Sequence, residues 1–327
     1  MAGKLYFNAS GLYNWATPTS GFDFICNKMY ESTDGRINWN LMNSNIKSSS
    51  NFNSISFFKP DTAYVASNDG ALLLGIFEGG TVQNWKWLVQ NNSIENKYVA
   101  INFYNKKCGV SLIDSIPGRA QIWSTIDSGY TWQLLSKPGK YYTKWKAIQA
   151  NENLLAIGEN GECTRIFYNA THMKFAVGEI GLPSNVNKIK AIDAKVSGTS
   201  FKAVLAAEDA SNITVFYTTD NLNGISTKWK AKLSSTQLTQ VKDLYLSISS
   251  NISIPVFSLV VLTSSNDLYA SSPKATADFY TNLALSWVNI SCSTSVGGPS
   301  NYIDLNDAIL SGFNYLQVDG FTTTGVI

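Results

Sequence analysis

Short runs of β-forming residues that end near a tryptophan recur along this chain about every 40 to 50 residues. One such unit contains apolar runs at 189–192, 203–205 and 215–217 and a tryptophan-led run at 229–231. Turns rich in Asn, Ser, Gly and Asp separate the runs, and no stretch of helical length shows helical apolar periodicity. The pattern predicts an all-β chain built as a β-propeller, whose blades each contain about four strands.

The repeat divides the chain into segments that each supply one blade. We place them at 12–42, 51–90, 97–137, 144–180, 188–234, 241–292, and 302–327 together with 1–10. The last segment offers only about three strands, so the N-terminal residues 4–7 would complete its sheet. Such pairing closes the ring and removes exposed edges. We predict one domain over 1–327 with seven blades, or six if the C-terminal strands only cap the ring or if one blade has been divided into two.

Residues 125–132 read Thr-Ile-Asp-Ser-Gly-Tyr-Thr-Trp and lie between two predicted strands. A carboxylate placed two residues before a glycine can accept backbone N–H bonds, and the glycine can adopt positive φ without steric cost. The final tryptophan begins the next strand as a buried anchor. We therefore expect a hairpin turn that is braced by its own residues, namely Thr125, Asp127, Gly129, Thr131 and Trp132.

This octapeptide resembles the Asp box, or bacterial neuraminidase repeat, at every specified position of Ser/Thr-x-Asp-x-Gly-x-Thr-Trp. Asp boxes occur in sialidases, in other glycoside hydrolases, in sortilin-like receptor domains and in non-enzymatic propellers. There the box joins the third and fourth strands of a blade, at the rim and away from the ligand-binding face. Degenerate copies lie at 32–39, 78–85 and 218–229. The resemblance implies a sialidase-like propeller fold without specifying an activity.

The sialidases themselves use three arginines on different blades to hold the substrate carboxylate, with a Tyr nucleophile paired to Glu and an Asp acid/base. The arginines of this chain are Arg36, Arg119 and Arg165, and Arg36 lies inside a degenerate box. The Arg-Ile-Pro signature of that family is missing. We therefore predict that the sialidase catalytic set is absent, and we assign no catalytic residue.

Other glycosidases need only two carboxylates, about 5 to 10 Å apart. The candidate acids near strand ends are Asp23, Asp69, Asp114, Glu159, Asp193, Glu208 and Asp319. Aspartates beside Gly or Asn commonly cap turns, and Asp69 and Asp319 are each followed by Gly. A glycoside hydrolase of the Asp-box group therefore remains the alternative to a binding protein.

Aromatic residues supply the candidates for both packing and binding. The tryptophans at corresponding strand starts are predicted to pack between blades: Trp39, Trp85, Trp132, Trp145, Trp229 and Trp287. Less regular aromatics are candidate platforms for a sugar ring or a partner loop: Trp15, Trp87, Trp123, Tyr141, Tyr142 and Tyr302. We predict a non-enzymatic propeller that recognises a protein or glycan partner on one face, with an assembly scaffold as a further alternative.

Composition excludes several other classes. The net charge is only +2, and Lys106-Lys107, expected in a solvated turn, is the only adjacent basic pair, so no nucleic-acid partner is predicted. His172 is the only histidine and is expected in a turn, so no multi-histidine metal site or other cofactor is expected. Cys26, Cys108, Cys163 and Cys292 show no C-x-x-C spacing. We expect free buried thiols, with an inter-blade disulfide as the alternative.

No apolar run approaches the roughly 20 residues of a spanning helix, so no membrane span is predicted. The first residues of the given chain lack the hydrophobic region of a secretory signal. The composition is charge-poor and rich in Asn and Ser, which is compatible with an extracellular or virion-surface protein. The localisation, the ligand, the binding face and the oligomeric state are left open.

Overall fold

Every element in the described part of the chain is a β-strand, and no helix occurs among those residues. The computed structural model describes residues 4–5, 20–25, 28–32, 40–41, 52–59, 62–67, 69–77, 85–92, 97–114, 116, 119–148, 153–158, 161–184, 186, 188–197, 200–208, 214–219, 227–234, 238, 240–249, 256–265, 267–271, 274–275 and 287–289. The predicted all-β class is confirmed.

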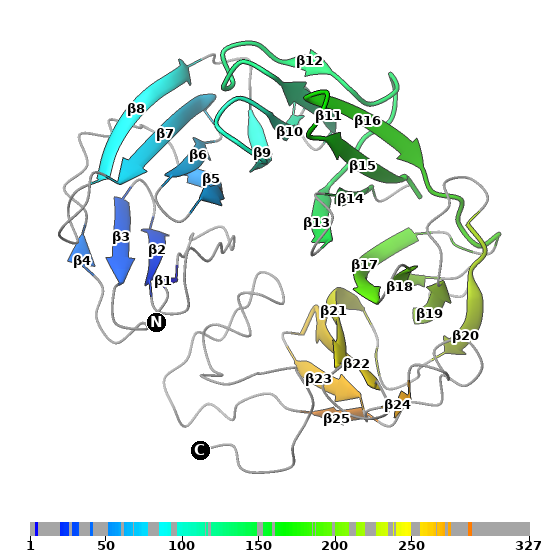
Figure 1. The fold of residues 1–327 in the computed structure, drawn as a ribbon. Coiled ribbons are helices and arrows are strands. Elements are labelled where there is room, and N and C mark those ends of the chain that lie inside the picture. Colours follow the sequence, from blue (N-terminus) through cyan, green and yellow to red (C-terminus); the bar gives the residue numbers. More distant parts are fainter. Residues whose placement is uncertain are drawn as a thin grey trace. The chain divides into compact units, whose positions relative to one another are not determined.

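The described strands form six sheets, which can be followed from blue to orange in Figure 1. The first three sheets contain β1 (Lys4–Leu5), β2 (Ser20–Ile25), β3 (Lys28–Ser32) and β4 (Asn40–Leu41); β5 (Phe52–Lys59), β6 (Thr62–Ser67), β7 (Ala71–Phe77) and β8 (Trp85–Asn92); and β9 (Tyr98–Phe103), β10 (Gly109–Asp114), β11 (Ala120–Thr125) and β12 (Gln133–Leu134).

The other three sheets contain β13 (Lys144–Ile148), β14 (Asn153–Ile157), β15 (Cys163–Asn169) and β16 (Lys174–Glu179); β17 (Lys188–Ser197), β18 (Ser200–Glu208), β19 (Thr214–Thr219) and β20 (Lys230–Ser234); and β21 (Val241–Ser249), β22 (Val256–Thr263), β23 (Leu268–Ser271), β24 (Lys274–Ala275) and β25 (Trp287–Asn289). Strands follow chain order within each sheet, except that β24 pairs with β22 beside the main path. Short connections between sequential strands favour this arrangement.

The strand pairings are antiparallel wherever their register is described, with one exception at the N-terminus. There β1 runs parallel to β2, and Lys4 lies opposite Ser20. The prediction assigned residues 4–7 to the last blade, so ring closure by that pairing is not confirmed. Residues 302–327 lie outside the described residues, and the number of blades therefore also stays a prediction.

The chain divides into two compact units. One contains Met1–Lys144 with Tyr168–Ala176, and the other contains Trp145–Phe167 with Val177–Ile327. The hairpin between β15 and β16 thus contributes its tip to the first unit.

The core of the first unit lies between the sheet of β5 to β8 and the sheet of β9 to β12. Tyr64 of β6 and Leu72 of β7 are fully buried in the same cluster as Tyr98 and Phe103 of β9. The rings of Tyr64 and Phe103 stack with their centroids 3.6 Å apart. Trp132 packs against this cluster, because its ring lies beside both Tyr98 and Phe103. Burial of this apolar surface holds the two sheets together.

Two hydrophobic clusters lie among the described residues of the second unit. The first combines Leu155 of β14 with Leu205 of β18, and Trp229 packs against it. The second combines Phe216 of β19 with residues of β21 and β22, and Trp287 packs against it. Trp132, Trp229 and Trp287 each contact a core that joins two successive sheets, so the predicted inter-sheet packing is confirmed for these three residues.

Polar side chains join the first strands of successive sheets. In the first unit, Ser54 Oγ of β5 accepts a hydrogen bond from Ile101 N of β9 at 2.9 Å, and Ser56 Oγ accepts one from Phe103 N at 2.7 Å. In the second unit, Asp193 Oδ2 of β17 accepts one from Leu246 N of β21 at 2.8 Å. These first strands stand at the ends of their sheets, so the bonds satisfy edge amides that lack a partner strand.

Candidate functional site

The turn at 125–132 joins β11 to β12, which are the third and fourth strands of their sheet in chain order. Asp127 Oδ1 accepts hydrogen bonds from Thr131 N at 2.9 Å and from Thr125 Oγ1 at 2.8 Å. Asp127 Oδ2 accepts a third from Thr131 Oγ1 at 2.6 Å, and Gly129 N donates to Thr125 Oγ1 at 3.0 Å. The turn is therefore fixed by its own side chains.

Gly129 is required at its position for two reasons. Its φ of 83° is unfavourable for residues with a side chain. A Cβ atom there would also overlap the side chain of Leu72 in the neighbouring sheet. The turn consequently sits directly on β7.

Hydrogen bonding also sets the charge of Asp127. Partial burial by itself would raise the pKa of this carboxyl. The bonds from the hydroxyl and amide of Thr131 and from the hydroxyl of Thr125 outweigh that effect, and the pKa lies below its usual 3.8. Asp127 is therefore a carboxylate at neutral pH, with its oxygens directed into the turn.

The connection between β9 and β10, residues 104–107, is held from two sides. Tyr64 OH of β6 donates to Lys106 O at 2.7 Å, and Ser128 N of the turn donates to Lys107 O at 2.9 Å. Burial raises the pKa of Tyr64 to about 12, although a hydrogen bond with the Ser128 side chain opposes the shift. Tyr64 is thus a protonated donor at neutral pH. Asn105 Oδ1 completes the loop by accepting bonds from Lys107 N and Cys108 N, both at 2.8 Å.

The tip of the β15–β16 hairpin packs on this loop through aromatic rings. Tyr168 stacks on Tyr104 with centroids 4.7 Å apart, and Phe175 lies 5.0 Å from Tyr168. Asn105 Nδ2 donates to Tyr168 OH at 2.7 Å. His172 is exposed in the turn, where its backbone N–H donates to Asn169 Oδ1 at 3.1 Å, as the sequence predicted for a turn residue.

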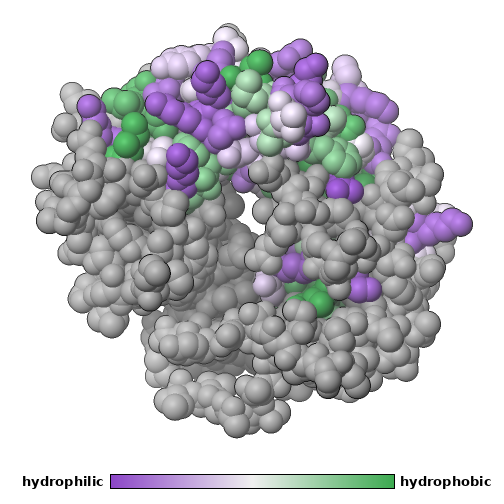
Figure 2. All heavy atoms as spheres, viewed as in Figure 1, coloured by the Kyte–Doolittle hydropathy of each residue, from purple (hydrophilic) through white to green (hydrophobic). Residues whose placement is uncertain are grey.

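The turn, the loop and the hairpin tip therefore form a continuous and well-braced part of the first unit. Their exposed lysines and large apolar residues define what we call the box-side surface: Lys106, Lys107, Ile126, Tyr130, Met173 and Lys174. Ile126, Tyr130 and Met173 are exposed to 62%, 60% and 52%. Figure 2 shows hydrophilic and hydrophobic residues side by side over the described residues in view.

The arginines considered for a sialidase site have other environments. Arg119 is exposed, with its guanidinium 5.5 Å from the ring centre of Tyr141. Arg165 is half-buried 4.4 Å from the ring centre of Phe167, and burial lowers its pKa. Arg36 lies outside the described residues. No observation brings the three together.

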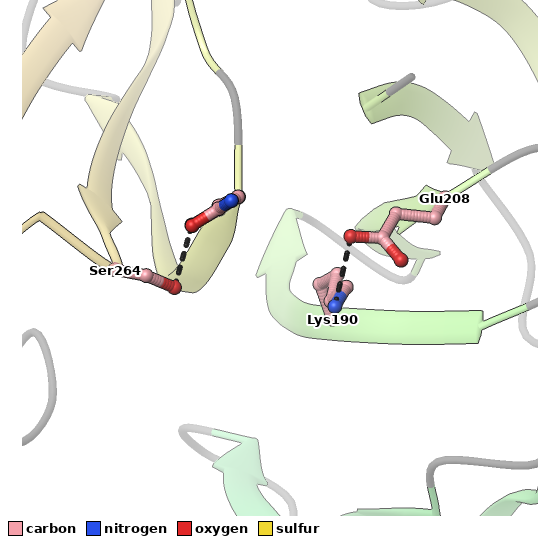
Figure 3. A network of polar contacts seen from close by, with 4 residues as sticks. Lys190, Glu208 and Ser264 are labelled. Atoms are coloured by element: carbon pink, nitrogen blue, oxygen red, sulfur yellow. Dashed lines mark hydrogen bonds and ion pairs between the residues drawn. The ribbon is translucent and has the colours of Figure 1, made fainter. Parts of the chain in front are cut away.

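The described candidate acids are engaged in local structure. Asp69 lies in the β6–β7 turn, where it contacts Ser67, and Asp114 accepts a hydrogen bond from Arg119 N at 3.0 Å. Asp193 is fully buried against backbone amides, and Glu208 lies 2.8 Å from Lys190 Nζ (Figure 3). In the same view, Ser264 Oγ donates to Gln240 O at 3.0 Å. The side chains outside the described residues are those of Asp23, Glu159 and Asp319.

The aromatic candidates also have structural positions where they are described. Tyr142 is 3% exposed, Trp123 packs against the first unit's core, and Tyr141 faces Arg119. The side chains of Trp15, Trp39, Trp85, Trp87 and Tyr302 lie outside the description, as do the degenerate boxes for the most part. The exposed Tyr130 and Ile126 were not singled out from the sequence. Both residues occupy positions of the turn motif at which any amino acid is allowed, so the motif itself does not point to them.

Cys108 and Cys163 are free and buried, which confirms the prediction for these two thiols; Cys26 and Cys292 lie outside the described residues. Among the described side chains, no three of His, Cys, Asp and Glu gather as metal ligands. The same part of the chain contains no helix of the length and hydropathy needed to cross a membrane.

Comparisons with known proteins identify the fold. No family model matches the chain, and no curated protein matches it. Among solved structures, it is similar to YCF48 bound to D1 peptide, with a TM-score of 0.52, 15% identity, and coverage of 86% of this chain and 83% of that chain. It is also similar to YCF48 from Cyanidioschyzon merolae, with a TM-score of 0.54, 12% identity and coverage of 88% and 85%. These similarities support a β-propeller fold.

Proposed function

We propose that this chain is a non-enzymatic β-propeller that binds a protein partner through the box-side surface. The observation that carries the proposal is the exposure of Ile126 and Tyr130 on a turn whose backbone is fixed by Thr125, Asp127 and Thr131. Apolar side chains that gather on a rigid surface mark sites of protein interaction. A rigid surface also loses little conformational entropy when a partner binds.

The aromatic residue is the expected anchor of such a site. Tyrosine offers a large apolar ring with few rotatable bonds and a hydroxyl that can form a hydrogen bond. The structure of YCF48 with D1 peptide shows a peptide on a protein of similar fold. Taken with the exposed anchor, that example supports a peptide segment as the part of the partner that binds here.

The alternatives have less support. A glycoside hydrolase needs a free pair of carboxylates, whereas Asp114, Asp193 and Glu208 each hold a structural partner. No observation among the described residues favours a glycan over a peptide. The position of the turn at 125–132 between the third and fourth strands of its sheet supports its assignment as an Asp box. The ring of seven blades, or six, stays a proposal from the sequence repeat.

Selection of a displayed random peptide library on the purified chain tests the proposal. Selected peptides should bind the Tyr130→Asp variant at least about tenfold more weakly, since loss of an aromatic anchor costs on the order of 2 kcal/mol. Ile116→Asp is the matched control, because Ile116 is 49% exposed in the β10–β11 connection at the opposite end of the same sheet.

Enrichment of no peptide, or equal binding to both variants, would contradict the proposal. The glycan and glycosidase alternatives are tested in parallel with a glycan array and a panel of chromogenic glycosides. Reproducible hydrolysis that disappears on substitution of two acids would establish the glycosidase instead.

A further inference from the structure

We infer that the segment bound at the box-side surface is an acidic peptide that carries apolar residues, an inference that rests on the proposed function. The charged residues of 104–107, 126–131 and 168–176 are Lys106, Lys107 and Lys174 against the single Asp127. These segments thus carry three positive charges and one negative charge, whereas the whole chain is nearly balanced, with 25 Lys and Arg against 23 Asp and Glu. Electrostatic complementarity of this kind selects an acidic partner.

The negative charge of Asp127 does not neutralise these lysines. Its two oxygens accept three hydrogen bonds from Thr125 and Thr131 within the turn. No ion pair joins Lys106, Lys107 or Lys174 to another described residue, whereas Lys190 of the second unit is paired with Glu208. The three ammonium groups therefore remain available to carboxylates of a partner.

The lysines are also anchored at fixed points of the backbone. The carbonyl oxygens of Lys106 and Lys107 accept hydrogen bonds from Tyr64 OH and Ser128 N. Lys174 directly precedes Phe175, whose ring packs on the Tyr104–Tyr168 stack. Charges on a preorganised framework lose less entropy on binding than charges on a loose loop.

Apolar residues on the same surface distinguish a peptide from a polyanion. Ile126 and Met173 offer no hydrogen bond to a phosphate backbone, but they can bury apolar side chains of a peptide. A nucleic-acid-binding surface carries a larger cluster of Lys and Arg than these three lysines provide. Exposed ion pairs contribute little affinity, so we expect apolar contacts to supply affinity and the lysines to supply selectivity.

Fluorescence anisotropy with three labelled peptides tests the inference. The probes share alternating Leu and Phe residues and place Glu, Gln or Lys between them. The chain should bind the Glu peptide on the order of tenfold more tightly than the Gln peptide at low salt, and the preference should shrink as salt is added. The Lys peptide and a labelled single-stranded oligonucleotide should bind more weakly still.

A pair of charge-reversal variants locates the effect. Lys106→Glu with Lys107→Glu should abolish the preference for the Glu peptide. Lys97→Glu with Lys140→Glu is the matched control, because it makes the same change of charge on exposed residues towards the other end of the same sheet. Lys106→Gln with Lys107→Gln repeats the test without adding negative charge.

The outcomes separate this inference from the proposed function. Equal binding of the Glu, Gln and Lys peptides with loss on Tyr130→Asp would retain a peptide-binding site and overturn the acidic preference. Tighter binding of the oligonucleotide, or a Glu preference that survives Lys106→Glu with Lys107→Glu, would also overturn it. Absence of binding by every peptide, here and in the library selection, would overturn both.

Discussion

The two units use different side chains to bind the backbone amides of an edge strand where successive sheets meet. In the first unit, β5 places the hydroxyls of Ser54 and Ser56 beneath the edge amides of β9. In the second unit, β17 places the carboxylate of Asp193 against the amide of Leu246 on β21. All three polar side chains are buried.

The difference shows that buried amides near an edge strand can be satisfied by separate hydroxyls or by one carboxyl group that serves two amides. Each Ser hydroxyl accepts a hydrogen bond from one amide, so its removal leaves one buried donor without an acceptor. The carboxyl group of Asp193 offers two acceptor oxygens and binds the amides of both Leu246 and Ala194, so two buried amides depend on this one residue. We therefore expect the second junction to be the more sensitive to substitution.

Among the substitutions that test this comparison, Asp193→Ala should reduce the stability of the chain most. It removes the acceptor from the amides of Leu246 and Ala194, and the loss should lower the free energy of unfolding by about 3 kcal/mol. Urea unfolding measures the loss, and hydrogen exchange of peptides covering 241–249 locates it. An effect below that of either serine substitution would reverse the proposed ranking.

Ser54→Ala combined with Ser56→Ala should come next, at about 2 kcal/mol for the pair. The amides of Ile101 and Phe103 lose their acceptors, and each of the two hydroxyls serves a single amide. The single variants should sum to the double variant within experimental error. Strong non-additivity would show that the two hydroxyls act as one unit and would weaken the contrast with Asp193.

Trp229→Phe and Trp132→Phe extend the comparison to equivalent tryptophans, each just before the last strand of its sheet. Trp229 Nε1 donates to Gly181 O at 2.7 Å, whereas the buried Nε1 of Trp132 has no hydrogen-bond partner among the described residues. Because both substitutions remove the same atoms, their difference reports the hydrogen bond, and Trp229→Phe should cost about 1 kcal/mol more. Equal losses in thermal or urea unfolding would refute this reading.

Acidification should have the smallest effect, confined to the turn of the first unit. Because the pKa of Asp127 is lower when folded, its contribution is present above about pH 4, near the usual pKa, and disappears as pH falls through the folded value. A smaller protection factor of the Thr131 amide at low pH, taken against the intrinsic exchange rate at the same pH and absent from Asp127→Asn, would measure it. A turn indifferent to pH would show that hydroxyl contacts alone hold it.

Repeating strand patterns were enough to predict the all-β class and the packing of Trp132, Trp229 and Trp287. These features depend on local periodicity and on large apolar side chains, which the sequence displays directly. Ring closure was not predictable in the same way, because strand pairing between distant segments leaves no local signal. The parallel pairing of β1 with β2 illustrates that limit.

The candidate surface was only partly predictable. The sequence indicated that Lys106-Lys107 lies in a solvated turn, and both side chains are exposed. It gave no sign that Tyr64 and Ser128 hold that loop, since these contacts join distant segments. The sequence also contains a shorter turn signal that was missed, a Ser or Thr two residues before an Asp. In three turns the hydroxyl donates a hydrogen bond to that Asp: Thr125 to Asp127, Ser67 to Asp69 and Ser265 to Asp267. The Ser/Thr-x-Asp step alone therefore marks such turns.

The two buried thiols have a practical consequence. Cys108 belongs to the first unit and Cys163 to the second, and burial raises the pKa of Cys163 to about 12, so its reactive thiolate is scarce while the chain is folded. Alkylation followed by peptide mapping would consequently time the opening of each half separately. The rate of alkylation at each thiol would report the unfolding of its own unit, whereas a single melting curve sums the unfolding of both units.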